Sequence, residues 1–234
     1  MKRNVVDFYM HYRARHDESI EDRHQAFASN MQELPAPLGW QGLEVPPVPD
    51  CGEYLGASFD VEYGISGLEL QGRYVYRGET YVYGDDVTYD DKVWVTFPTH
   101  SRRLDYRSML HEHLPVVMEA FGGYAGHGYF GSYVVKYENI HAAEIEALRK
   151  KPGIDVNGRN NIFTLNVVEY WDAELCQRAL GYGPDEVIKR LTGKVPLVKS
   201  LMDGVYVVFN DNPDLTFEGF CAYNDRLKPV LGLV

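Results

Sequence analysis

The sequence predicts an α+β fold, with a mainly antiparallel sheet and helices packed on one face of it. The order of the residue patterns indicates this class: a strand and a helix come first, a β-meander follows in the first half, and strands then alternate with helices. The length of 234 residues favours a single domain over residues 1–234, because a chain of this size buries roughly 70% of its unfolded surface in one core. The order in which the strands pair does not follow from these patterns.

Residues 5–12 form the first predicted strand, because apolar and polar side chains alternate along them. The apolar side carries Val6, Phe8, Met10 and Tyr12, and this period of two is typical of a strand with one buried face. A helix is predicted next, with Ser19 or Asp17 as its N-cap and an end before Pro35. Residues 35–50 contain five prolines and two glycines, which predict an irregular connection.

Residues 54–98 are predicted to form the β-meander, since short runs of alternating side chains recur there. The apolar positions of these runs are Phe59, Val61, Tyr63, Ile65, Leu68, Leu70, Tyr74, Tyr76, Tyr81, Tyr83, Val93, Val95 and Phe97. Glycines at positions 64, 67 and 78 suit the positive φ angles of tight hairpin turns. A helix over this stretch is not expected, because the apolar residues recur every two positions and not every three to four.

Helices and strands alternate from residue 105 onward. The first predicted elements are a helix over 105–121 with a kink or the start of a second helix at Pro115, a strand over 129–137, a helix over 142–150 and a strand over 161–170. Helices that begin after Asp172 and at Gly183-Pro184, a strand over 205–209 and a last helix opened by Asn212-Pro213 follow. Asp172 is expected to cap its helix and Gly181 to end it. Pro184 suits a first helical turn, because a proline lacks the N–H that would have no partner there.

The charge balance of the chain argues against nucleic acids as partners. The chain has 23 basic and 34 acidic residues, a net charge of −11, and a protein this acidic repels the phosphate backbone of nucleic acids. We expect no membrane-spanning segment, since no stretch of about 18 uncharged apolar residues occurs. The N-terminus lacks the apolar core of an export signal, and Cys51, Cys176 and Cys221 are not spaced as a disulfide framework or zinc site. These features predict a soluble, cytoplasmic protein with reduced thiols.

Motifs that would carry catalysis are all incomplete. Gly126–Gly131 matches GxGxxG, but a helix is predicted before it and a strand after it, so we expect a tight or flexible connection instead of a dinucleotide site. The histidines of His111-Glu112-His113 are only two residues apart, and Pro115 stands where a zinc ligand would be needed. Cys176 falls in an apolar helical pattern typical of a core cysteine. The sequence therefore assigns no catalytic residue, no cofactor and no metal, and predicts that the protein is not an enzyme.

The acidic cluster of residues 85–91 is the candidate partner-binding site. It lies in a segment, residues 52–100, that has nine acids, three bases and seven of the 18 tyrosines. Tyrosine is favoured in protein interfaces, and acidic charge attracts a basic partner. The residues assigned to a partner-binding surface are Tyr83, Asp85, Asp86, Tyr89, Asp90 and Asp91. A solvated hairpin tip and a weak cation site are the alternatives for the aspartates.

The C-terminal third resembles a known group of bacterial proteins. The segments that carry the resemblance are Tyr170-Trp171-Asp172-Ala173-Glu174-Leu175, Gly183-Pro184-Asp185-Glu186, and Leu201-Met202-Asp203-Gly204-Val205-Tyr206-Val207-Val208 with Asp211-Asn212-Pro213 after it. Through these segments the chain is similar to immunity proteins of polymorphic-toxin and type VI secretion systems, in particular to immunity protein family 52. Members of that family accompany toxins of restriction-endonuclease-like fold.

The resemblance implies an antitoxin that binds a cognate type VI secreted toxin, expected to be a basic nuclease, and neutralises it by protein–protein contact. The acidic charge agrees, because a nuclease surface attracts phosphates and an acidic protein is steered onto it. Two alternatives stay open from the residues. One is a small-molecule enzyme of unfamiliar α+β fold that uses His111, His113 and the loop over 122–131, and the other is a non-catalytic structural or adaptor protein whose tyrosines form a homo-oligomer.

Overall fold

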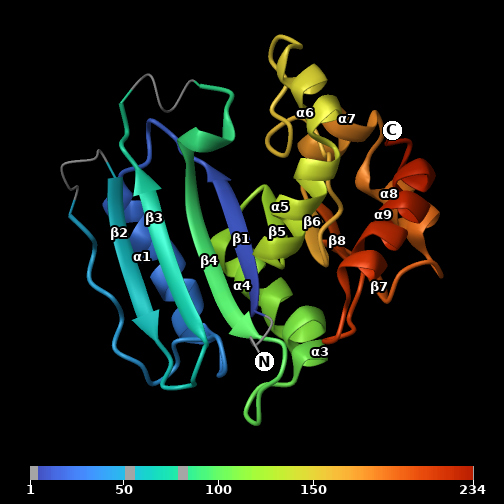
Figure 1. Ribbon diagram of the computed structural model, residues 1–234. Helices are drawn as coiled ribbons and strands as arrows, with labels where there is room; N and C mark the ends of the chain where they lie inside the picture. The colour runs from blue at the N-terminus through green and yellow to red at the C-terminus, as the bar shows by residue number, and fades with distance from the viewer. Residues whose placement is uncertain (1–4, 51–55, 79–83, 234) are drawn as a thin grey trace.

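The computed structural model describes residues 5–50, 56–78 and 84–233, and over these residues the strands form one eight-stranded antiparallel sheet (Figure 1). The strands are β1 (Val5–Arg13), β2 (Gly56–Glu62), β3 (Glu69–Val75), β4 (Asp90–Pro98), β5 (Ala125–Tyr129), β6 (Val168–Trp171), β7 (Leu197–Leu201) and β8 (Gly204–Val208). Their order across the sheet is β2-β3-β4-β1-β5-β6-β8-β7. The predicted α+β class is confirmed, and the first strand of the chain lies in the middle of the sheet.

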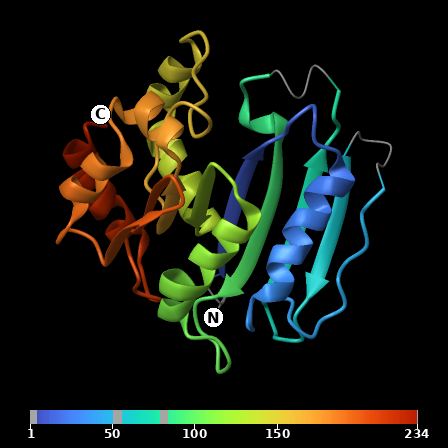
Figure 2. The same ribbon diagram turned by 180° about the vertical axis from the view of Figure 1, so that it is seen from behind.

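The helices are distributed unevenly over this sheet. The helical segments are α1 (Ile20–Glu33), the 3-10 turn η1 (Val87–Tyr89), α3 (Tyr106–Ser108), the π-helical segment η2 (Met109–His113), α4 (Leu114–Phe121), α5 (Gly131–Ile140), α6 (Ala142–Arg149), α7 (Ala173–Leu180), α8 (Pro184–Leu191) and α9 (Phe217–Leu231). Figure 2 shows α1 and α4 side by side over one face of the N-terminal half of the sheet. Every residue of β6 and β8 is buried, so both faces are covered in the C-terminal half. The prediction that helices pack on one face of the sheet therefore applies to the N-terminal half of the sheet.

The first strand and helix form where their patterns predict them. The apolar side of β1 is fully buried at Val6, Phe8 and Met10. Helix α1 begins at Ile20 because the Ser19 side chain accepts a hydrogen bond from a backbone N–H of the first turn. Phe27 of this helix packs edge-on against the rings of Trp40 and Phe121, with ring centroids 5.3 and 5.4 Å apart.

The β-meander is confirmed, since β2, β3 and β4 are consecutive neighbours in the sheet. Gly64 and Gly67 both have positive φ in the turn between β2 and β3, as tight turns require. The further strand predicted through Tyr81 and Tyr83 lies outside the described residues, as does Cys51.

The prediction of a strand over 129–137 is wrong. The strand β5 comes earlier, and Gly131 begins helix α5. Tyr133 and Tyr137, four residues apart, pack against Phe220 of α9 with ring centroids 6.0 and 5.6 Å away. This tertiary packing of one helical face outweighs the local strand preference.

The GxGxxG segment consequently spans a strand and the start of a helix, and not a turned connection. A Cβ atom on Gly128 would lie 2.3 Å from Val168 Cγ1, and one on Gly126 would lie 2.8 Å from Phe8 Cζ. Neighbouring side chains thus occupy the space that larger residues would need. Gly126 and Gly128 therefore allow the close packing of neighbouring side chains against the sheet.

Pro115 disturbs its helix as predicted. The π-helical segment η2 precedes it, and the proline occupies the first turn of α4. A proline has no N–H and its ring collides with the preceding turn, so a regular α-helix cannot run through this position.

The C-terminal caps are confirmed, whereas several boundaries differ. The Asp172 side chain accepts the N–H of Leu175 at the start of α7, and Gly181 ends that helix in the left-handed conformation. The strand predicted over 161–170 is limited to β6, and β7 was not predicted. Helix α9 begins after the cap Thr216 and not at Asn212-Pro213. In the parts of the chain that the structure describes, each helix is too short or too polar to cross a bilayer.

Candidate binding face

One face of β2, β3 and β4 in the N-terminal half of the sheet is left uncovered by the described helices, whereas α5 and residues 157–166 stand beside it at β1 and β5. Helices α1 and α4 lie behind β1 to β4 in the view of Figure 1, and the front of these strands carries the side chains that alternate with the core residues. We call this surface the open face, formed by Asp7, Tyr9, Asp60, Glu62, Glu69, Gln71, Arg73, Lys92, Trp94, Thr96, His127 and Tyr129.

A ladder of three aromatic rings crosses the middle of the open face. Tyr9 of β1 stacks on Trp94 of β4, with ring centroids 5.5 Å apart and planes 13° from parallel. On its other side Tyr9 stacks on Tyr129 of β5, with values of 5.6 Å and 4°. All three side chains are half-buried. Such cross-strand stacks stabilise a sheet, and here they also present a rigid apolar surface to solvent.

Carboxylates border the aromatic ladder. Asp7 is held in place by a 2.7 Å hydrogen bond from Thr96 Oγ1. The open face carries more acidic than basic side chains: Asp7, Asp60, Glu62 and Glu69 against Arg73 and Lys92. Burial lowers the pKa of Lys92, although the nearby Asp90 carboxylate opposes this shift. The surface around the ladder is therefore acidic.

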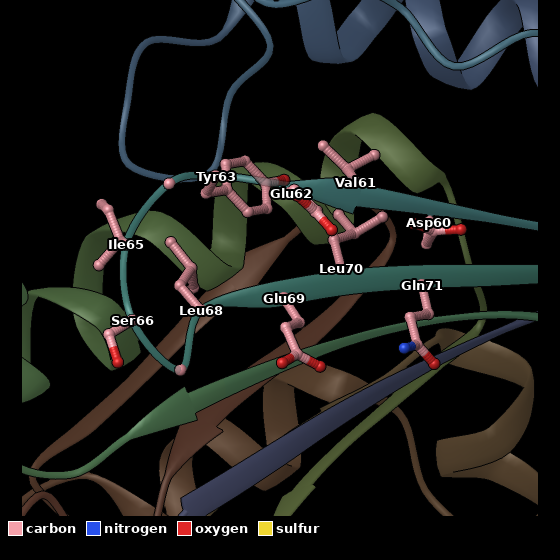
Figure 3. A pocket seen from close by; sticks show the side chains of 12 residues that line it. Asp60, Val61, Glu62, Tyr63, Ile65, Ser66, Leu68, Glu69, Leu70 and Gln71 are labelled. Atoms are coloured by element: carbon pink, nitrogen blue, oxygen red, sulfur yellow. The ribbon is translucent and has the colours of Figure 1, made fainter.

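A hollow of about 440 Å³ lies along the β2–β3 hairpin and is lined by residues 60–71; Figure 3 shows the side chains that line it. The side chains of Leu68 and Leu70 point to one side of β3, and those of Glu69 and Gln71 point to the other, toward the open face. The Tyr63 hydroxyl donates a 2.7 Å hydrogen bond to a backbone carbonyl and is thereby fixed in a structural role. One hairpin supplies the whole lining, and its exposed carboxylates Asp60, Glu62 and Glu69 belong to the acidic border of the open face.

A second cavity, of about 310 Å³, lies beside the ladder between the sheet, α5 and residues 157–166. We call it the polar cavity. His127 Nδ1 lies 2.5 Å from Glu169 Oε2, and Glu169 Oε1 accepts the backbone N–H and the side-chain amide of Asn166 at 2.9 and 2.7 Å. The ring of His11 lies 5.5 Å from that of His127. The two histidines, far apart in the sequence, thus meet across β1 and β5.

The two histidines of the polar cavity differ in their preferred charge. Burial lowers the pKa of His11 to about 4 despite the Asp90 carboxylate 3.3 Å away, so its ring is neutral at pH 7. Burial also disfavours a charged His127, yet the hydrogen-bonded Glu169 carboxylate raises its pKa above the ordinary value. The Glu169 carboxylate can only accept, so Nδ1 of His127 carries a proton.

Asp90 and Asp91 occupy buried positions at the start of β4, 1% and 0% exposed. Arg159 donates to Asp90 from Nε at 2.9 Å and from Nη2 at 2.5 Å. Arg77 donates to the two oxygens of Asp91 at 2.9 and 2.8 Å. Both aspartates therefore form buried ion pairs and are inaccessible to a partner. Their assignment to the partner-binding surface is corrected by this burial.

The other predicted partner-binding residues fare differently. Asp85 is exposed and pairs with Arg178 of α7, and this hydrogen bond lowers the pKa of Asp85. Asp86 is exposed and accepts the N–H of Thr88 at 2.7 Å as the N-cap of η1. Tyr89 is half-buried in that turn, and Tyr83 lies outside the described residues. The predicted set is thus divided between the core and the surface.

The structure also locates the residues weighed for catalysis. His111 Nε2 lies 3.1 Å from Asp211, which Arg107 also contacts at 3.1 Å. Cys176 is fully buried, and burial raises the pKa of its thiol to about 12, so it is not a reactive thiolate. Within the described ranges, no group of three or more His, Cys, Asp or Glu side chains is placed to hold a metal ion.

The sequence interpretation missed the open face. Neither Trp94 nor Tyr9 is singled out from the sequence. Their alternation with buried neighbours signals exposed aromatic residues on adjacent strands. The three rings lie together because β1 pairs with both β4 and β5. Local sequence patterns do not predict this pairing.

Comparisons with known proteins return little. No protein-family model and no curated protein matches the chain. Among solved structures, the Pseudomonas aeruginosa T6SS protein PA0821 is similar with a TM-score of 0.49 and 14% sequence identity, over 97% of this chain and 74% of that one.

Proposed function

We propose that this protein is an immunity protein that binds a cognate type VI secreted toxin through the open face and neutralises it without catalysis. The observation that supports the proposal is the half-buried aromatic ladder with an acidic border, on the side of the sheet opposite α1 and α4. The sequence resemblance to immunity proteins adds the class of partner, a toxin expected to be a basic nuclease.

The chemistry of the open face suits a basic protein surface. Stacked aromatic rings bury much apolar area at a low cost in conformational entropy, because their orientation is already fixed. The carboxylates at the border attract a basic partner over a distance of about 8 Å at physiological salt. The ladder would then supply the desolvated centre of the interface and the acids its rim.

A kinetic experiment with the toxin encoded beside this protein tests the role of the ladder. Trp94→Ala should accelerate dissociation of the complex about thirtyfold, since a buried aromatic anchor is worth about 2 kcal/mol. Tyr76→Ala, which truncates an exposed tyrosine beyond the end of β3, is the matched control and should leave the kinetics unchanged. Circular dichroism verifies that both variants are folded.

The acidic border predicts a different kinetic signature. The triple variant Asp60→Asn, Glu62→Gln, Glu69→Gln should slow association more than it accelerates dissociation, and salt should reproduce the effect. The control triple Glu33→Gln, Glu112→Gln, Glu119→Gln removes exposed carboxylates of α1, η2 and α4, which belong to the helical side of the sheet. Equal effects of the two triples would contradict binding through the open face.

Growth of bacteria tests the immunity role itself. Co-expression should rescue cells from the toxin, and the Trp94→Ala variant should protect less well than the Tyr76→Ala variant. Cells that die equally fast with and without this protein would refute the antitoxin function.

The two alternatives make different predictions. A homo-oligomer joined through the open faces would set two acidic borders against each other, which charge repulsion disfavours; sedimentation at low concentration tests it. A small-molecule enzyme would use His111, His113 and residues 122–131, and His127 of that segment is hydrogen-bonded to Glu169. Thermal-shift screening with metals and nucleotides tests that alternative.

A further inference from the structure

The hairpin between β7 and β8 turns through only two residues, Met202 and Asp203, because Leu201 pairs with Gly204 at its end. Met202 has a φ of 48°, and among the residues that the structure describes it is the one non-glycine residue with a positive φ. Where only the first of two turn residues has a positive φ, glycine is preferred, because a Cβ atom is crowded there. Met202 therefore strains the backbone at a position that glycine would fill without strain.

The interior of the protein does not account for this strain. The Met202 side chain is 40% exposed, so it contributes little to the buried core. Neighbouring residues fix the turn instead, since Leu201 is buried and a Cβ atom on Gly204 would lie 2.1 Å from the carbonyl oxygen of Trp171. Residues held in strained conformations cluster at functional sites. The methionine side chain is therefore a candidate for a contact outside the fold.

The tip of the hairpin, residues 201–204, is held in place from below. The hydroxyl of the fully buried Tyr170 donates a 3.1 Å hydrogen bond to Asp203 Oδ1. A fixed turn presents Met202 to a partner in one position, which lowers the entropy cost of binding. The flexible thioether side chain itself adapts to irregular apolar pockets.

Charged side chains of both signs surround Met202. It lies at a cavity of about 370 Å³ that is also lined by Arg13 and by the exposed residues Arg15, Glu174 and Asp203. An apolar contact with a polar rim is typical of a protein–protein interface. An anionic membrane surface would repel Asp203 and Glu174, and the net charge of −11 repels nucleic acids. A protein is therefore the partner that suits this surface.

We propose that Met202 is an anchor residue in the interface with a partner protein. Its side chain inserts into an apolar pocket of the partner, and a basic side chain at the rim of that pocket faces Asp203. The hairpin tip is a contact surface separate from the residues of the open face. The inference rests on the proposed function for the identity of the partner, the cognate toxin, but not for the role of the open face.

Nuclear magnetic resonance of methionine methyl groups labelled with carbon-13 tests the proposal directly. In the free protein, a soluble paramagnetic agent should broaden the Met202 signal, which the Met202→Leu variant identifies. Met10, Met31, Met109 and Met118 are fully buried and should be shielded from the agent. Saturation with the toxin should shield Met202 as well. A Met202 methyl group that stays accessible in the complex would overturn the proposal.

Met202→Gly separates a role in binding from a role in folding. This variant should keep the melting temperature or raise it by about 2–4 °C, because glycine removes the strain, and should weaken toxin binding at least about tenfold. Met202→Leu keeps a large apolar side chain and should bind within about threefold of the wild type. A lower melting temperature of Met202→Gly would assign the methionine to the fold and overturn the inference.

The matched control is Leu43→Ala, which truncates a side chain that is 39% exposed in the connection between α1 and β2. This control should leave the affinity for the toxin unchanged. Equal affinities of Met202→Gly and Leu43→Ala would refute the role of Met202.

Trp94→Ala, measured in parallel, separates the inference from the proposed function. If only Trp94→Ala weakens binding, the inference is overturned and the proposed function stands. If only Met202→Gly weakens binding, the hairpin tip is supported and the open face is contradicted. A toxin that does not bind the wild-type chain refutes the proposed function and the inference with it.

Discussion

Replacement of Asp90 by asparagine should be among the most damaging single changes to this fold. The Asp90 carboxylate accepts two hydrogen bonds from Arg159, at 2.9 and 2.5 Å, and one from the Tyr124 hydroxyl at 2.5 Å. Asp90 and Arg159 are 1% and 5% exposed. Loss of the negative charge leaves the guanidinium buried without a counterion.

The size of the effect follows from this burial. Removal of one partner of a buried ion pair costs about 3–5 kcal/mol, and we expect about 3 kcal/mol because asparagine keeps one acceptor oxygen. This is a large part of the roughly 5–15 kcal/mol that stabilises a typical domain. The matched control is Asp86→Asn on the same segment, where the side chain is exposed and caps a short turn; its cost should stay within about 1 kcal/mol.

Urea denaturation monitored by circular dichroism measures the free energies of unfolding. The double variant Asp90→Asn, Arg159→Gln should be less destabilised than the sum of the single variants, since it leaves no unpaired charge. If Asp90→Asn unfolds at the same urea concentration as Asp86→Asn, the reasoning about the buried ion pair is wrong. A combined replacement of Asp85, Asp86, Asp90 and Asp91 would therefore report on folding before it could report on steering of a partner.

Three further predictions concern other parts of the molecule. The pKa of His11 is lowered to about 4 in the folded state, so the unfolded chain binds the extra proton between pH 6.5 and 4. The contribution of His11 to stability should therefore fall by about 2 kcal/mol from pH 7.5 to 5, and urea titrations of His11→Asn should lack this part of the pH dependence. Gly128→Ala should cost about 1–3 kcal/mol, since its Cβ would meet Val168, whereas Gly131→Ala, with open space around it, should leave the melting temperature unchanged or higher. Thr99→Val should raise the free energy of unfolding by about 1 kcal/mol through removal of a hydroxyl without a partner among the described residues; a lower midpoint in urea would contradict that interpretation.

Local patterns in the sequence determined the α+β class, the meander and the cap residues. Alternation at Val6, Phe8 and Met10 identifies a buried strand face, and Ser19 and Asp172 identify helix starts, because these features depend on neighbours only a few residues away. The strong acidic charge is likewise a property of the chain alone.

Tertiary structure alone decided which of these residues work together. Asp90 and Asp91 look like surface acids beside Asp85 and Asp86, yet two arginines distant in the chain neutralise them inside the core. Trp94, Tyr9 and Tyr129 form one ladder because β1 inserts between β4 and β5. His127 and Glu169 meet only through the pairing of β5 with β6. Contacts between strands far apart in sequence have no local period, so the open face and the polar cavity arise from the pairing order of the sheet.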